Sequence, residues 1–157
     1  QTRRKELRKQ GRKKGKKNTN AKVTTIDGIK FASGLEAYCY QQLKKAKVKA
    51  DYEGRKFELI EKFNYPGDFY DKGREKGVKV YKKKTGNIRN ISYTPDFISE
   101  EHRFIIETKG LRTPEFNMRF KLFFKKLVDD GNIYDIYIPS NRKEVDKTIE
   151  LIKSKIK

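Results

Sequence analysis

The sequence predicts an α/β domain in which a helix, three strands, a second helix, a fourth strand and a last helix follow one another. Two observations carry this prediction. Three segments repeat apolar residues every three or four positions, which is the period of an amphipathic helix. Between these segments, short apolar runs end at turn residues, as buried strands do. A chain of 157 residues suffices for one domain over residues 21–157, and no internal repeat indicates a second.

A basic arm precedes this domain. Residues 1–20 contain ten Lys and Arg, one acid and a single apolar side chain, Leu7. Because such a segment cannot form a core, we expect a flexible arm. Its net charge of +9 is nearly half of the +19 of the whole chain, so we expect it to bind nucleic-acid phosphates; the alternative is a solubilising or localisation tail. The candidate nucleic-acid-binding residues are Arg3, Arg4, Lys5, Arg8, Lys9, Arg12, Lys13, Lys14, Lys16 and Lys17.

A first helix is predicted over residues 33–47. Its apolar residues share one face because they recur every three or four positions. These residues are Leu35, Cys39, Leu43 and Ala46. Ser33 and Glu36 have the spacing of a capping box, in which the Glu side chain accepts a hydrogen bond from the N–H of the cap residue. Local spacing therefore favours a capping role for Glu36 over a role in a functional site.

Three strands are predicted next. Residues 52–63 form the first, and residues 90–98 and 103–110 form the second and third, joined by a turn over 99–103. Residues 65–90 are rich in Gly and Lys, so we expect them to leave the core as a hairpin or a long loop.

The C-terminal part continues with a helix, a strand and a helix. Thr113 and Pro114 predict a helix start, with a side-chain cap followed by Pro at the first position. Gly131 ends this helix. Residues 133–139 form a strand, and Ser140 is predicted to cap the last helix. The apolar stripes of the two helices are Phe116, Phe120, Phe123 and Leu127, and Val145, Ile149, Ile152 and Ile156.

The turn between the second and third strands determines which residues face each other. With Glu101 and His102 at the tip of a hairpin, Asp96 lies opposite Glu107, with Cα atoms about 4.5–5.5 Å apart. Two like charges in this position repel each other, by about 4 kcal/mol at an effective dielectric constant near 20. A cation between the carboxylates would remove this cost, and hard oxygen ligands favour Mg²⁺ or Mn²⁺. The sequence therefore predicts a metal site at Asp96 and Glu107.

Lys109 lies on the same strand face as Glu107, because side chains two residues apart point to one side. A lysine beside a metal site is suited to hold an attacking water or to stabilise negative charge that grows on a phosphate. Thr108 points to the other face, toward the core, while its backbone carbonyl is free to reach the metal. For an isolated Glu-x-Lys, the simpler interpretation is an edge strand that runs into solvent.

Three segments resemble the active-site segments of a known family. SGLE (33–36), YTPDF (93–97) and ETKGL (107–111) are similar to those of the bacteriophage endonuclease I family, four-way-junction resolvases within the PD-(D/E)xK nuclease superfamily. DGIKFASGLEA and KGLRTPEF also resemble a group of uncharacterised phage proteins assigned to that superfamily. The resemblance covers residues 25–139. It implies a restriction-endonuclease-like core of order α-β-β-β-α-β, to which the C-terminal helix and the basic N-terminal arm are added.

The resemblance also assigns residue roles. Asp96 and Glu107 would be metal ligands together with the carbonyl of Thr108, and Lys109 would act on the water or the transition state. Glu36 would bind a second metal or its water, against its local capping pattern. Residues 65–90 depart from the family pattern, in which this region carries a strand exchanged between two subunits. A homodimer is therefore an open expectation, although symmetric cutting of a junction needs two sites.

The function implied by the resemblance is a Mg²⁺-dependent endonuclease that hydrolyses DNA phosphodiester bonds and resolves branched DNA such as Holliday junctions. Two alternatives stay open. One is a nuclease or nickase of another DNA target. The other is a non-catalytic nucleic-acid-binding protein, whose aromatic side chains would stack on bases unless they simply pack in the core. These are Phe57, Phe63, Tyr65, Phe69, Tyr70 and Tyr81. The acids Asp96 and Glu107 favour the enzyme, because a pure binder gains nothing from acids that face DNA.

The remaining reactive side chains exclude other mechanisms. His102 is the single histidine and lies on the predicted turn, where we expect it to be exposed, so histidine-based nuclease chemistry is excluded. Cys39 lies on the apolar helix stripe and is predicted to be a core residue rather than a nucleophile. No segment approaches the ~20 apolar residues of a membrane span, and no apolar signal-peptide core follows the basic start. We therefore expect a cytoplasmic protein without a membrane partner, in a bacterial host cell if it is phage-encoded.

Overall fold

The computed structural model describes residues 22–156 as a mixed α/β fold with three helices and several small sheets. The predicted arm and its ten candidate DNA-binding residues lie outside the described residues. The helices are α2 (Gly34–Lys45), α3 (Pro114–Asp129) and α4 (Arg142–Ile156). The largest sheet has the order β12-β11-β10-β3 and consists of β3 (Asp51–Tyr52), β10 (Phe97–Ser99), β11 (Phe104–Ile106) and β12 (Asp135–Tyr137). The predicted mixed α/β class is thus confirmed, and the three predicted helices follow one another as expected.

The other strands pair two by two. They are β1 (Thr24–Ile26) with β2 (Ile29–Phe31), β4 (Phe57–Ile60) with β9 (Ile91–Tyr93), β5 (Phe63–Asn64) with β8 (Asn87–Ile88), and β6 (Tyr70–Glu75) with β7 (Val78–Lys83). Among residues 22–156, no helix is both long and apolar enough to cross a membrane.

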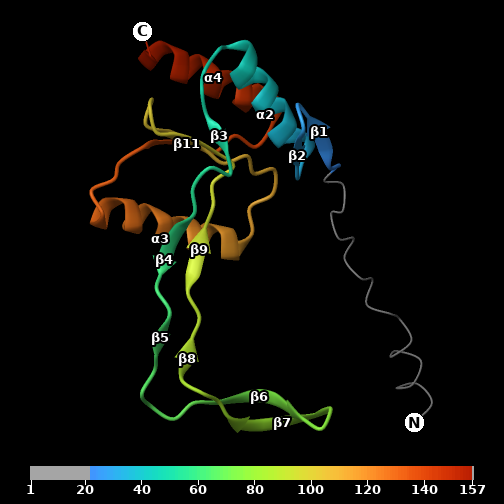
Figure 1. Ribbon diagram of the computed structural model, residues 1–157, viewed down its shortest axis with the longest axis vertical. Helices are drawn as coiled ribbons and strands as arrows, with labels where there is room; N and C mark the ends of the chain where they lie inside the picture. The colour runs from blue at the N-terminus through green and yellow to red at the C-terminus, as the bar shows by residue number, and fades with distance from the viewer. Residues whose placement is uncertain (1–21, 157) are drawn as a thin grey trace, which may run out of the picture.

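Helices cover both faces of the four-stranded sheet (Figure 1). Phe97, Phe104 and Ile106 pack on one face against α2 and α4. Ile98 and Ile105 pack on the other face against α3. The alternation follows from the two-residue period of a strand, and it makes a three-layer arrangement with two apolar cores.

The predicted helix stripes are buried as expected. Cys39 and Leu43 of α2 are buried, and all four stripe residues of α3 belong to the second core. Cys39 is a core residue, and burial, followed by the nearby charge of Asp96, raises the pKa of its thiol to about 12. In α4, Val145, Ile149 and Ile152 are buried, whereas Ile156 is 40% exposed because it is the last residue of the helix.

Two predicted strands are each broken in the structure. The first strand, predicted over 52–63, breaks after Tyr52, where Glu53 has the left-handed φ of 48°. A side chain at Gly54 would place its Cβ 2.6 Å from the Asp51 Cβ, so the backbone approaches too closely for any other residue. The second strand, predicted over 90–98, breaks at 94–96. As a result, β3 pairs with β10 while β4 pairs with β9.

A β-hairpin that was not predicted precedes α2. β1 and β2 are joined by Asp27 and Gly28, whose φ angles are 51° and 77°. Two positive φ angles define the type I′ turn that Asp-Gly favours, so this dipeptide was the signal in the sequence. Ile26 and Ile29 pack against the first core.

The helix starts follow the predicted caps with two corrections. Thr113 caps α3 by accepting a hydrogen bond from the Phe116 N–H (3.2 Å), as predicted. The cap of α4 is Asn141 rather than Ser140, since the Asn141 side chain accepts from the Glu144 N–H (2.9 Å). Glu144 in turn accepts from the Ser140 N–H (2.6 Å), one residue before the cap. The second correction concerns Glu36, which makes the same displaced contact at the start of α2.

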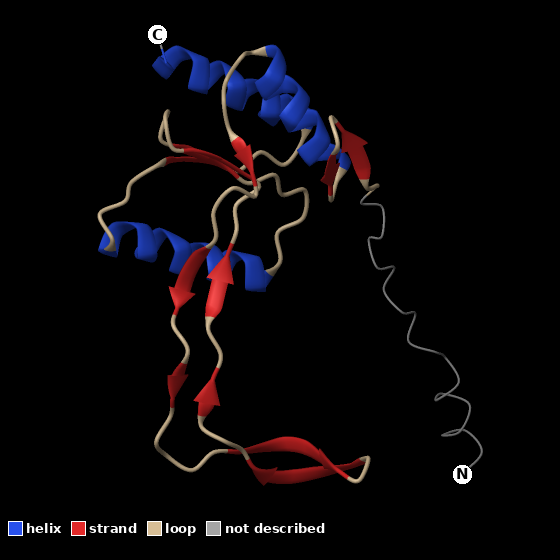
Figure 2. Cartoon of the chain, viewed as in Figure 1, coloured by secondary structure: helices blue, strands red, loops and turns tan. Residues whose placement is uncertain are grey.

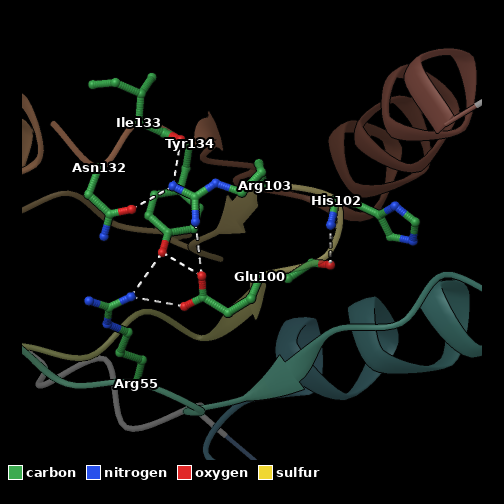
Figure 3. A network of polar contacts seen from close by, with 8 residues as sticks. Arg55, Glu100, His102, Arg103, Asn132, Ile133 and Tyr134 are labelled. Carbon is green, nitrogen blue, oxygen red and sulfur yellow. Dashed lines mark hydrogen bonds and ion pairs between the residues drawn. The ribbon is translucent and has the colours of Figure 1, made fainter.

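A polar network holds the turn between β10 and β11 (Figure 3). Glu100 accepts hydrogen bonds from Arg55 (3.0 Å), Arg103 (3.0 Å) and the Tyr134 hydroxyl (2.7 Å). Arg103 also donates to the Ile133 carbonyl (3.0 Å), and its guanidinium lies 3.9 Å from the centroid of the Tyr134 ring. The network joins the turn to the chain before β4 and to the loop after α3. It lies at the end of β10 and β11 opposite to Asp96 and Glu107.

The predicted excursion is a two-stranded ribbon that leaves the core (Figure 2). β4 and β9 begin it beside α3, β5 and β8 continue it, and the hairpin of β6 and β7 ends it (Figure 1). Within the described chain, neither core includes a residue of 61–92. The outer ribbon is therefore held by its own ladder hydrogen bonds.

Excision of the outer ribbon tests this independence. We expect replacement of Phe63–Ile88 by Asn-Gly to leave the melting temperature within a few degrees of wild type, because both cores stay intact and Asn-Gly closes a two-residue hairpin. Circular dichroism and thermal unfolding measure this. A chain that no longer unfolds cooperatively would show that the ribbon stabilises the core.

Candidate functional site

The register of β10 and β11 brings Asp96 and Glu107 together. Phe97 pairs with Ile106 and Ile98 with Ile105, so one residue beyond the ladder Asp96 stands opposite Glu107. The predicted register of the hairpin is therefore confirmed for residues 97–99 and 104–106, and it places Asp96 next to Glu107. The third predicted residue, Thr108, donates from its N–H and its hydroxyl to Asp96 Oδ2, both at 2.7 Å.

Each acid is oriented through one oxygen and leaves the other free. Glu107 Oε2 accepts from the Tyr93 hydroxyl at 2.5 Å. Within residues 22–156, no side chain donates to Asp96 Oδ1 or Glu107 Oε1, although the nearby Asp96 N–H contributes to lowering the pKa of Glu107. No buried side-chain oxygen in this part of the chain lacks a hydrogen-bond partner, so both free oxygens reach solvent. Two fixed carboxylates thus present one open oxygen each.

Burial and mutual repulsion disfavour ionisation of both acids. Burial, followed by the charge of Glu107, raises the pKa of Asp96 to about 7. Burial likewise raises the pKa of Glu107, although the Tyr93 hydrogen bond and the Lys109 charge oppose the shift. Burial and the charge of Glu107 raise the pKa of Tyr93, so its hydroxyl stays protonated and donates. The pair carries a cost at neutral pH that a cation would relieve.

Lys109 continues the strand geometry past β11. The Glu107 N–H donates to the Tyr137 carbonyl (2.9 Å) and the Lys109 N–H to the Pro139 carbonyl (3.0 Å). Both N–H groups point toward the neighbouring strand, so both side chains lie on one face, as predicted. The Lys109 ammonium lies 5.0 Å from the centroid of the Phe116 ring at the start of α3. The ammonium therefore lies close to the start of α3.

Glu36 is occupied by its own helix start and by β3. Its Oε2 accepts from the Ala32 N–H (3.1 Å) and the Tyr52 hydroxyl (2.6 Å), and its Oε1 accepts from the Ser33 hydroxyl (3.0 Å). The predicted bond to the Ser33 N–H is replaced by the bond to Ala32. Glu36 is 8% exposed, and its negative charge still contributes to raising the pKa of Asp96 and of Glu107.

A cleft of about 750 Å³ lies beside these groups, where the starts of α2 and α4 meet the chain after β11. It is lined by residues 33–36, 108–111 and 140–142. Glu36, Thr108 and Lys109 therefore share one cleft. Asp96 and Glu107 are not among its lining residues, and Asp96 is joined to it through Thr108.

The donor set fits Mg²⁺ or Mn²⁺ with two protein carboxylates. Among the described residues, no three His, Cys, Asp or Glu side chains gather as a metal cage. Mg²⁺ is commonly held by one or two carboxylates, with water and substrate phosphate supplying the remaining ligands. Asp96 and Glu107 offer their open oxygens for this. In residues 22–156, no protein N–H donates to the Thr108 carbonyl, so that oxygen is available too.

Sequence reasoning missed the two tyrosines that orient the acids. Tyr93 and Tyr52 come from different strands and donate to Glu107 and Glu36. Neither has a local pattern that could reveal this role. His102 lies on the turn as predicted, but its side chain is 24% exposed rather than fully exposed.

The candidate base-stacking aromatic residues divide into two groups. Phe57 is a core residue, 5% exposed, and packs edge-on against Phe123. The others lie on the ribbon, where Phe69 is partly buried and the exposed members are Phe63, Tyr65, Tyr70 and Tyr81.

Comparison with known proteins places the chain in a family. Residues 14–138 match the family described as Protein of unknown function (DUF1064). The chain belongs to the DUF1064 family. The matched region of this DUF1064 protein includes Glu36, Asp96, Glu107 and Lys109. No curated protein and no solved structure matches the chain.

The raised pKa of Asp96 predicts a pH-dependent stability. In the metal-free protein, the folded state holds a proton on Asp96 up to about pH 7, whereas the unfolded chain releases it near 3.8. Folded protein therefore binds more protons in this window, and its stability falls as the pH rises through it. Asp96→Asn removes this proton and therefore the pH dependence. We expect the free energy of unfolding of the variant, relative to that of wild type, to increase between pH 4 and 7 by on the order of 2–4 kcal/mol.

Urea unfolding in EDTA across this pH range makes the measurement. Asp71→Asn, at an exposed acid of β6, controls for the loss of one negative charge. A difference between Asp96→Asn and wild type that does not change with pH would contradict the burial of an ionisable pair.

Proposed function

We propose that this protein is a Mg²⁺-dependent endonuclease that hydrolyses DNA phosphodiester bonds, with branched DNA such as Holliday junctions as its substrate. The observation that carries the proposal is the opposition of Asp96 and Glu107 across β10 and β11, each with one oxygen open to solvent. Lys109 lies on the same strand face as Glu107, which adds a positive charge beside that acid. The resemblance of these segments to phage junction resolvases of the PD-(D/E)xK superfamily supports the same assignment.

The roles follow from the contacts of each side chain. Asp96, Glu107 and the Thr108 carbonyl would hold the metal, which when bound supplies positive charge to the scissile phosphate. Thr108 and Tyr93 fix the two carboxylates through short hydrogen bonds, so the ligands need little reorganisation. The Lys109 ammonium supplies a point charge for the phosphate oxygens that become more negative in the transition state.

Glu36 has a second proposed role at the cleft. Its carboxylate lines the cleft together with Lys109. A negative charge there would orient the attacking water or hold a second metal, while the helix-start contacts keep the side chain in place. Two copies of the site, in a homodimer, would be needed for symmetric cutting of a four-way junction.

Removal of the acids or the lysine should separate cleavage from binding. We expect Asp96→Ala, Glu107→Ala and Lys109→Ala to abolish cleavage of a synthetic four-way junction in Mg²⁺ while binding persists. Loss of either acid should strengthen binding slightly, because repulsion of phosphate is relieved. Gel assays of cleavage and of binding in EDTA measure both properties, with flaps, plain duplexes and single strands as alternative substrates.

The outcomes distinguish the candidate functions. Cleavage of flaps or duplexes in preference to junctions would assign a different DNA target to the same chemistry. Cleavage by purified Asp96→Ala at more than a few per cent of the wild-type rate would refute the site. Binding without any cleavage by wild type would favour the non-catalytic alternative.

Glu36→Gln tests the second role of Glu36. Its amide oxygen can still accept from the Ala32 N–H and the Tyr52 hydroxyl, and its NH₂ can donate to the Ser33 hydroxyl. We therefore expect a stability cost below about 1 kcal/mol. The lost negative charge should lower the cleavage rate at least a hundredfold.

Glu144→Gln is the matched control, since Glu144 makes the same contact at the start of α4 and is exposed. We expect it to cleave at the wild-type rate. Near-wild-type cleavage by Glu36→Gln at saturating Mg²⁺ would show that Glu36 only caps its helix.

A further inference from the structure

The hairpin at the end of the ribbon sorts its charges by face. In the β6–β7 ladder, residues directly opposite each other lie on one face, and successive residues alternate. One face, called the basic face below, consists of Tyr70, Lys72, Arg74, Lys79, Tyr81 and Lys83. The opposite face consists of Asp71, Gly73, Glu75, Val78, Val80 and Lys82. The basic face thus holds four of the five basic strand residues and neither acid.

All six residues of the basic face are exposed. The Tyr70 and Tyr81 rings stack on each other with centroids 6.0 Å apart, and they are 49% and 77% exposed. No hydrophobic core residue covers this surface, because the ribbon beyond residue 60 contributes to neither core.

The charges of the basic face are largely uncompensated. Lys82, on the opposite face, pairs with Glu75 at 3.6 Å, and Lys83 pairs with Asp68 at 2.6 Å. Among the described residues, no acid lies within ion-pair distance of Lys72, Arg74 or Lys79. Arg74 and Lys79 stand directly opposite each other in the ladder. Two like charges in this position destabilise a hairpin, and an anion on this face would remove the repulsion.

We propose that the basic face of the β6–β7 hairpin binds the phosphates of duplex DNA. The inference rests on the proposed action on DNA and adds a second contact surface, away from the cleft. The chain from Phe57 to Tyr70 reaches at most about 43 Å at ~3.3 Å per residue. That reach is comparable to the ~34 Å of one turn of B-DNA, so the hairpin would contact the duplex up to about one turn beyond the start of β4.

Duplex DNA fits this surface better than other occupants. A second copy of the chain would bring two faces of the same sign together, which opposes self-association here. Single strands are held by aromatic rings that stack on bases, but Tyr70 and Tyr81 already cover one face of each other. A two-stranded ribbon is narrow enough for the ~12 Å major groove of B-DNA, whose phosphates line both rims.

Binding of a labelled linear duplex in EDTA, over a series of NaCl concentrations, tests the proposal. The test variant combines Lys72→Gln, Arg74→Gln and Lys79→Gln. We expect its Kd to rise at least about tenfold, and the slope of log K against log salt to shrink by about 0.9 for each phosphate that the variant no longer neutralises. The control removes the same charge from the helices with Lys125→Gln, Lys147→Gln and Lys153→Gln. We expect it to stay within about twofold of wild type and to keep its salt slope.

Two matched single substitutions test whether the basic face, rather than the hairpin as a whole, binds DNA. Lys79→Gln and Lys82→Gln alter lysines of one strand that point to opposite sides. We expect only Lys79→Gln to reduce the salt slope, by about 0.9. Melting temperatures equal to that of wild type establish that the variants fold.

Equal losses of duplex affinity in the hairpin and helix variants would overturn the proposal. So would equal reductions of the salt slope by Lys79→Gln and Lys82→Gln, or a loss of affinity confined to single-stranded DNA. A change of oligomeric state in light scattering, with unchanged DNA affinity, would assign the face to a second copy instead. Failure of the proposed nuclease function gives a different result. In that case wild type binds duplex with a hairpin-dependent salt slope but does not cleave DNA in Mg²⁺.

Discussion

The register of β10 against β11 is the constraint on which the candidate site depends. Apolar side chains of these strands alternate between a core under α2 and α4 and a core under α3. A shift of one residue would turn every one of them to the wrong face, so both cores hold the same register. Asp96 therefore stays opposite Glu107 although the two carboxylates repel each other. The burial of neighbouring apolar residues offsets the cost of the acids.

Hydrogen bonds from different parts of the fold then orient the acids. Thr108 holds Asp96, Tyr93 holds Glu107, and Tyr52 with the start of α2 holds Glu36. Each bond restricts the side chain, and none of the donors brings a positive charge to the acids. Polar groups in a partly buried site are most useful when they arrive preoriented, because no reorganisation is then needed on binding. The same helix-start geometry at Glu144 serves capping alone, so the position of a helix start, rather than its chemistry, distinguishes the two glutamates.

The ribbon follows different physical rules from the core. It buries few apolar side chains, and its two-residue alternation separates charge instead of separating apolar from polar residues. On β6 and β7 this produces one face of positive charge and tyrosine and one face with both acids. Such an arrangement costs stability in isolation, and a polyanion removes that cost. The fold thus combines a rigid layered core that holds the acids with an extended element that carries positive charge away from it.

The sequence by itself determined those features that depend on local period and turn chemistry. The spacing of Phe120, Phe123 and Leu127 determined α3, the turn over 99–103 determined the pairing of Asp96 with Glu107, and the composition of 65–90 determined that it leaves the core. Only the tertiary structure decided where two predicted strands break, that Glu36 bonds to Ala32 and Tyr52, and that Tyr93 orients Glu107. These features depend on contacts between residues far apart in the chain, or on the close approach of the Gly54 backbone to Asp51. Local pattern carries no information about such contacts, because they exist only after the sheet and helices have packed.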